Sequence, residues 1–129
     1  MIVQQYLPAE WELRVFVIGE RVVGYRVEKL DPAQLWVDPE AVRVSPTTVP
    51  GDLAAKLLAL SRHWRLQVAA FDLLAVDGDF VFLEVNVNCD WRWFEHRAAC
   101  TAVSEAVHEW VRLRFSALES SLRYRARAG

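Results

Sequence analysis

The stretch from Phe71 to Glu95 constrains the fold more than any other part of the chain. Two apolar runs are joined there by Asp77-Gly78-Asp79, and an Asp-Gly pair between apolar runs is a strong signal for a β-hairpin. Acidic residues are poor strand formers and are costly to bury without a partner. Asp72 in the first run and Glu84 in the second are therefore the residues that need an explanation.

Asp72, Glu84 and Asn86 together offer oxygen donors from both predicted strands. Glu84 and Asn86 share a face because side chains alternate along a strand. Asp72 joins them if the hairpin has a three-residue loop, for which Gly78 can supply the positive φ, or a β-bulge. Carboxylate and amide oxygens on one face suit a hard cation such as Mg²⁺, so a metal site predicts an irregular hairpin. The alternative is that all three are polar residues at an edge or on a solvent-exposed face.

Hydrophobic periodicity predicts the other elements. We expect strands over residues 2–7, 11–18, 21–27, 35–37, 42–44, 66–76 and 79–86, a polar aromatic loop over 88–97, and helices over 51–64 and 98–124. The apolar stripe of the second helix contains Val103, Val107, Trp110, Val111, Leu118 and Leu122, with Phe115 beside it. The predicted fold class is α+β: a mainly antiparallel sheet with two helices on one face.

Length and composition suit one globular domain. The chain has 129 residues, of which 53% are hydrophobic and six are Trp, which is more apolar surface than a small domain easily buries. We therefore expect self-association or a partner protein. The net charge of −2 gives no argument for a nucleic-acid partner, and the absence of a long apolar run predicts no membrane association. Cys89 and Cys100 are expected to be reduced thiols in a cytoplasmic protein, because no export signal precedes them.

The polar residues of the hairpin sit in motifs that resemble the ATP-grasp ligases. The matching segments are Phe71-Asp72-Leu73, Phe82-Leu83-Glu84-Val85-Asn86, Asn88 and Trp91-Arg92-Trp93-Phe94-Glu95. They look like the metal-binding end of that family, above all of the graspetide branch that matures ribosomally made peptides and of its glutamate-ligase relatives. Gln4-Gln5-Tyr6-Leu7-Pro8, followed by Glu12-Leu13-Arg14-Val15, resembles the hinge and the next strand of the same family.

The resemblance implies a nucleotide site near the start of the chain. Backbone groups of Gln5, Tyr6 and Leu7 would hold the adenine edge of ATP, Glu12 would contact the ribose hydroxyls, and Arg14 would face the phosphates as a catalytic positive charge. A carboxylate suits a diol and a guanidinium suits phosphate oxygens. The residues alone leave another interpretation open, in which Glu12 and Arg14 form an ion pair on a solvated face.

The resemblance also implies a reaction and a cofactor. Asp72, Glu84 and Asn86 would bind Mg²⁺, or Mn²⁺, and ATP would phosphorylate a carboxylate to an acylphosphate that an amine or hydroxyl then attacks. The partners would be ATP and a peptide or another carboxylate substrate. Residues 1–129 would form the C-terminal subdomain, without the substrate domain and first grasping subdomain that complete such a ligase. The missing half, or a second copy of the chain, would then be a further partner.

Two departures from the family pattern keep a second interpretation open. The segment from Lys29 to Val49 lacks the Asp-x-Arg or Asn/Arg signature that family members often carry, and Val87-Asn88-Cys89-Asp90-Trp91 lacks the usual proline and glycine. In that loop, Trp91 and Trp93 would either cover a ligand or pack on the core. The chain could therefore be a non-catalytic ATP-grasp remnant that serves as a peptide-binding or assembly module.

Overall fold

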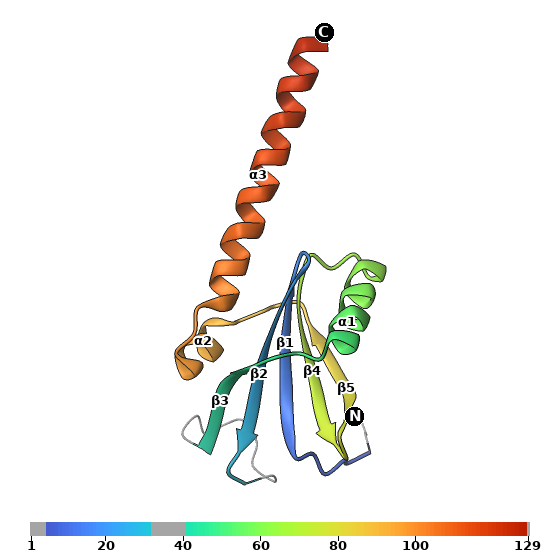
Figure 1. Cartoon of the computed structure of the whole chain (residues 1–129), viewed down its shortest axis with the longest axis vertical. Helices are drawn as coiled ribbons and strands as arrows, with labels where there is room; N and C mark the ends of the chain where they lie inside the picture. Colours follow the sequence, from blue (N-terminus) through green and yellow to red (C-terminus); the bar gives the residue numbers. More distant parts are fainter. Residues whose placement is uncertain (1–4, 32–40, 129) are drawn as a thin grey trace.

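The computed structural model describes residues 5–31 and 41–128. Five antiparallel strands form one sheet in the order β3-β2-β1-β4-β5 (Figure 1). The strands are β1 (Trp11–Ile18), β2 (Arg21–Lys29), β3 (Val42–Thr47), β4 (Val68–Val76) and β5 (Asp79–Asn86). The helices are α1 (Gly51–His63), α2 (Arg92–Ala98) and α3 (Ala102–Ala128). The α+β class and the antiparallel sheet predicted from the sequence are confirmed.

The helices cover both faces of the sheet rather than one. Leu57 of α1 packs against the odd-numbered apolar residues of β1, whereas α2 and the start of α3 pack on the opposite face against Phe16 and Ile18. The reason lies in β1, where Val15, Phe16, Val17 and Ile18 are all buried. A strand that is apolar at consecutive positions needs cover on both sides.

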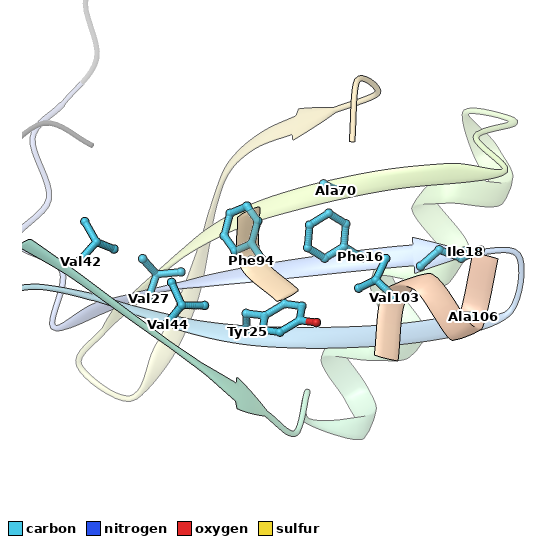
Figure 2. Packing of buried hydrophobic residues seen from close by; sticks show 10 residues of the cluster. All are labelled: Phe16, Ile18, Tyr25, Val27, Val42, Val44, Ala70, Phe94, Val103 and Ala106. Atoms are coloured by element: carbon cyan, nitrogen blue, oxygen red, sulfur yellow. The ribbon is translucent and has the colours of Figure 1, made fainter. Parts of the chain in front are cut away.

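An aromatic cluster fixes α2 against the sheet. The Phe94 ring of α2 lies 5.5 Å from the Phe16 ring and 6.0 Å from the Tyr25 ring. The close-up in Figure 2 shows these three side chains within one cluster. Val103 and Ala106 of α3 close the same cluster and are fully buried. This face of the sheet is therefore covered by helices near Phe16 and Ile18.

The long helix predicted over 98–124 begins only at Ala102, and a separate short helix, α2, precedes it in the predicted loop. Ala99 has a φ of 47°, which lies in the left-handed region and ends α2. The carboxylate of Glu95 then accepts hydrogen bonds from the backbone N of Ser104 at 2.7 Å and from its Oγ at 2.6 Å. Glu95 thus satisfies a backbone donor in the first turn of α3. The loop predicted over 88–97 is wrong for residues 92–97, which belong to α2.

Glu95→Ala is expected to lower the free energy of unfolding by about 1–2 kcal/mol, because both Ser104 groups lose their acceptor. Chemical denaturation followed by circular dichroism measures this loss. Glu95→Gln keeps one oxygen acceptor, so it should cost less. Equal stability of the Glu95→Ala variant and the wild type would show that the α2–α3 joint does not depend on this side chain.

Three further strand predictions have different outcomes. Gln5, Tyr6 and Leu7 have no regular secondary structure, so the strand predicted over 2–7 is wrong for these residues. Residues 2–4 lie outside the described part of the chain. The strand expected at 35–37 also lies outside it. The strand expected at 42–44 is confirmed and extends to Thr47, with Pro46 tolerated because β3 is an edge strand. None of the helices in the described ranges is long and apolar enough to cross a membrane.

Candidate functional site

The hairpin of β4 and β5 contains the irregularity that a shared carboxylate face requires. Asp77 and Gly78 form its turn with φ values of 51° and 82°, and Val76 pairs with Asp79. A turn of this length alone would place Asp72 and Glu84 on opposite faces. The register shifts between Asp72 and Leu73, so Glu84 becomes the direct cross-strand partner of Asp72. The hairpin therefore contains a β-bulge, one of the two irregularities that the predicted metal site required.

Asp72 lies at the centre of a row of charged side chains across three strands. It pairs with Glu84 of β5 on one side and with Arg14 of β1 on the other. Nε of Arg14 lies 2.8 Å from Oδ1 of Asp72, although the N–H does not point at that oxygen, so the contact is an ion pair without a hydrogen bond from Nε. The Arg14 guanidinium also stacks 4.9 Å from the centre of the Phe94 ring, which limits its movement.

The carboxyl group of Asp72 is buried, with only 7% of the residue exposed. Burial raises the pKa of Asp72 to about 7, Arg14 opposes that rise, and the charges of Glu84 and Glu12 together with a hydrogen bond to Glu84 add to it. The positive charge of Arg14 therefore does not offset burial and the negative charges of Glu84 and Glu12, which together raise the pKa of Asp72. A divalent cation beside Asp72 and Glu84 would supply the missing positive charge.

Asn86 follows Glu84 on the same face, but its side chain is partly used. Its Oδ1 accepts a hydrogen bond from the backbone N of Asn88 at 3.1 Å. No group of three or more His, Cys, Asp and Glu side chains among the described residues is placed to hold a metal ion. The row contributes two carboxylates and the Asn86 amide, a set of oxygen donors that suits Mg²⁺. The alternative interpretation, polar residues at an edge or in solvent, is wrong for Asp72, which is buried in an inner strand. It holds for Glu84, which is exposed on the edge strand β5.

A pocket of about 330 Å³ lies next to this row, at the start of β1. Gln5, Tyr6, Leu7 and Glu12, the four residues that the resemblance assigns to adenine and ribose, all line it. Nζ of Lys29 lies 2.6 Å from Oε1 of Glu12, and both side chains are largely buried. The structure thus gives Glu12 and Arg14 separate partners in a sheltered setting, and the interpretation as one solvated ion pair is wrong.

No family model matches the sequence. No curated protein matches it either. Among solved structures, the ATP-grasp ligase PsnB in complex with Mg and ADP superposes with a TM-score of 0.68 at 20% identity, covering 84% of this chain and 34% of PsnB. The macrocyclase MdnB from Microcystis aeruginosa gives 0.65 at 25%, covering 81% and 38%.

A third solved ligase superposes on the chain at lower sequence identity. D-alanine–D-alanine ligase from Bacillus anthracis superposes with a TM-score of 0.52 at 17% identity, over 98% of this chain and 44% of that ligase. The chain has part of the ATP-grasp fold. It spans 34% and 38% of the length of PsnB and MdnB. The resemblance inferred from the sequence is therefore confirmed.

Lys29 and Leu83 line the pocket but were not predicted as site residues from the sequence. Lys29 was predicted to follow the end of β2, but the strand continues to Lys29 and places its ammonium group beside Glu12. The alternation of Tyr25, Val27 and Lys29 on one face was the available signal. Leu83 lines the pocket because it is the extra residue of the bulge, and only the register reveals that position.

The aromatic loop residues pack on the core of the ATP-grasp sheet. Trp91 donates a hydrogen bond from Nε1 to Oγ of Ser104 at 3.0 Å, and the Trp93 ring lies 4.9 Å from Phe94. Both tryptophans belong to the cluster around Phe16. The interpretation of Trp91 and Trp93 as core packing is therefore the one that the structure supports.

Stability should fall as the pH rises, because the pKa of Asp72 is higher in the folded chain than the unfolded value of 3.8. Between about pH 4 and 7 the folded state binds the extra proton, so the contribution of Asp72 is complete below the unfolded pKa and is lost through about pH 7. The difference in free energy of unfolding between wild type and Asp72→Asn should change by on the order of 3–4 kcal/mol over that range. Denaturation at several pH values measures it; a pH-independent difference would contradict the raised pKa.

Proposed function

We propose that the chain supplies the nucleotide- and Mg²⁺-binding part of an ATP-dependent ligase that joins a carboxylate to an amine or a hydroxyl. One observation carries this proposal: the pocket at Glu12 and the charged row at Asp72 lie side by side on one face of the sheet. Successive residues on one face of a strand are about 7 Å apart, so Glu12 and Arg14 follow the order of ribose and phosphate in a nucleotide.

Each side chain has a role that fits its surroundings. Backbone groups of Gln5, Tyr6 and Leu7 would hold the adenine edge at the far side of the pocket. Glu12 would accept hydrogen bonds from the ribose hydroxyls, with Lys29 holding the carboxylate in place through their 2.6 Å ion pair. The permanent charge of Arg14 would lie along the phosphates, steadied by the Phe94 ring.

Asp72, Glu84 and Asn86 would hold Mg²⁺. When bound, the ion neutralises phosphate charge and orients the terminal phosphate. The buried Asp72 must be deprotonated to act as a ligand, so its raised pKa makes metal binding dependent on pH. Mn²⁺, which takes similar oxygen ligands, would substitute for Mg²⁺.

The complete ligase would phosphorylate a substrate carboxylate. The carboxylate oxygen attacks the terminal phosphorus of ATP and ADP leaves; an amine or hydroxyl then attacks the acyl carbon of the acylphosphate and phosphate leaves. Residues 1–129 would be the C-terminal subdomain of that enzyme, and a further part would supply the rest of the phosphate clamp. The coverage of about a third of PsnB and MdnC supports this division.

The proposed substrate is a peptide. MdnC was solved with its precursor peptide MdnA, and PsnB with a minimal precursor. A non-catalytic remnant with a peptide-binding or assembly role is the alternative, and the altered loop at residues 87–91 is consistent with it. The buried carboxyl of Asp72 favours the ligase, because a charge that opposes folding near neutral pH is typical of a functional site.

Two-dimensional NMR of the chain titrated with ADP and Mg²⁺ tests the proposal. We expect chemical-shift changes confined to the pocket and the charged row, and an affinity about tenfold lower for Glu12→Gln, which loses the charged acceptor. Glu28→Gln is the matched control, since Glu28 pairs with Arg26 and does not line the pocket. No shift changes, or changes elsewhere on the sheet, would contradict the proposed site.

A further inference from the structure

The C-terminal part of α3 leaves the body of the molecule. The start of the helix packs on the sheet through Val103, Ala106, Val107 and Trp110, whereas its remainder extends beyond the other elements (Figure 1). Six large apolar side chains are exposed there, including Leu113 and Tyr124. The other four lie at heptad spacing: Val111 37%, Phe115 65%, Leu118 57% and Leu122 57%. We call these four residues the α3 stripe. The sequence pattern predicted Val111, Leu118 and Leu122 in the apolar stripe of the helix with Phe115 beside it, and the structure leaves all four exposed.

The spacing of the α3 stripe is that of a coiled-coil seam. Successive members are separated by four, three and four positions, which is the alternation of a heptad repeat and keeps them on one side of the helix. The next positions of the same repeat are His108 and Arg125, both polar and exposed. The apolar seam is therefore bounded at each end, as an interface with a second helix of similar length would be.

The seam is also symmetric about the bond between Ser116 and Ala117. Val111 and Leu122 are equally distant from it, and so are Phe115 and Leu118. We propose that α3 pairs antiparallel with α3 of a second copy of this chain around a two-fold axis. Val111 of each copy then packs against the partner's Leu122, and Phe115 against the partner's Leu118.

The charges beside the seam complement one another in this arrangement. Arg112 and Glu119 occupy equivalent flanking positions of the repeat, where an antiparallel pair brings Arg112 of one copy near the partner's Glu119 twice over. A parallel pair would stack Phe115 on itself and would also bring Arg125, the next position of the repeat, against its own copy. Like charges in contact oppose association, so the antiparallel orientation is favoured.

The short length of the apolar seam limits the affinity of the two copies for each other. From Val111 to Leu122 it is only about 17 Å long, and it buries far less than the roughly 800 Å² per partner of a standard interface. We therefore expect a dissociation constant of about 10–100 µM, so that the chain is monomeric when dilute and dimeric when concentrated.

Sedimentation equilibrium of the full chain over about 5–300 µM tests the pairing. The wild type should shift from monomer to dimer, and Leu118→Glu should remain monomeric because it buries two charges in the seam. Leu113→Glu is the matched control: Leu113 is 54% exposed on the same helix but lies away from the seam, so this variant should dimerise as the wild type does. Circular dichroism of dilute samples should show both variants folded. A monomeric wild type at the highest concentration, or equal loss in both variants, would overturn the proposal.

Disulfide trapping tests the orientation. A mixture of Val111→Cys and Leu122→Cys chains should form a mixed disulfide, whereas Val111→Cys alone should not, because the two copies of residue 111 would lie about 16 Å apart along the axis. The wild type controls for Cys89 and Cys100, which are both half-buried free thiols. Efficient cross-linking of Val111→Cys to itself would overturn the antiparallel arrangement.

Discussion

Replacing Phe94 by alanine is expected to lower the free energy of unfolding by about 3–5 kcal/mol, the cost of removing a fully packed aromatic ring from a core. Phe94 is only 4% exposed and its ring touches those of Phe16, Tyr25 and Trp93. No other residue of α2 is buried, so the helix would lose its main attachment to the sheet. Urea denaturation followed by circular dichroism gives the difference directly.

The control for this prediction is Phe115→Ala, measured on dilute protein. The Phe115 side chain is 65% exposed, so the same truncation should cost less than about 1 kcal/mol. Similar losses for Phe94→Ala and Phe115→Ala would mean that α2 does not pack as the structure has it. The Phe94→Ala variant should also free the Arg14 guanidinium, which lies over that ring.

The second large effect concerns Mg²⁺. Asp72→Asn and Glu84→Gln should each lower the affinity for Mg²⁺ at least tenfold, because each removes one of two carboxylate ligands while keeping the size of the side chain. In the wild type the affinity should also fall by up to tenfold per pH unit below about pH 7, where Asp72 is protonated in the absence of metal. Calorimetry in buffers of different ionisation enthalpy detects the released proton.

Asp79→Asn is the matched control for the metal prediction. Asp79 is an exposed carboxylate at the start of β5, away from the charged row, so this variant should bind Mg²⁺ like the wild type. If Asp72→Asn and Asp79→Asn bind Mg²⁺ equally well, the row of Arg14, Asp72 and Glu84 is an ion-pair network of the fold and not a metal site.

The hairpin shows how far sequence reasoning reaches in this chain. The Asp-Gly turn was visible from residue types, and two carboxylates on one face demanded an irregular register. The sequence offered two solutions, a three-residue loop or a bulge, and the structure uses the bulge with the turn at Asp77 and Gly78. The choice between the loop and the bulge depends on how Leu83 packs in the folded hairpin. The local sequence pattern does not encode that packing.

Other features depend on contacts between distant segments. The break between α2 and α3 rests on Glu95 reaching Ser104, which a continuous apolar pattern from Ala98 onward conceals. The placement of helices on both faces was implied by the unbroken apolar run at residues 15–18 but was not predicted. The proposed nucleotide contacts of Gln5 and Tyr6 came from a family resemblance, because contacts made by backbone groups would leave little trace in residue type.

Calorimetric titration of the chain with a non-hydrolysable ATP analogue, with and without Mg²⁺, tests most directly whether the pocket and the charged row form one site. We predict binding that requires Mg²⁺ and that is lost in Asp72→Asn, since the pocket and the row would hold one nucleotide–metal complex between them. Binding of equal strength without Mg²⁺ and in Asp72→Asn, or no binding to the wild type, would contradict this account.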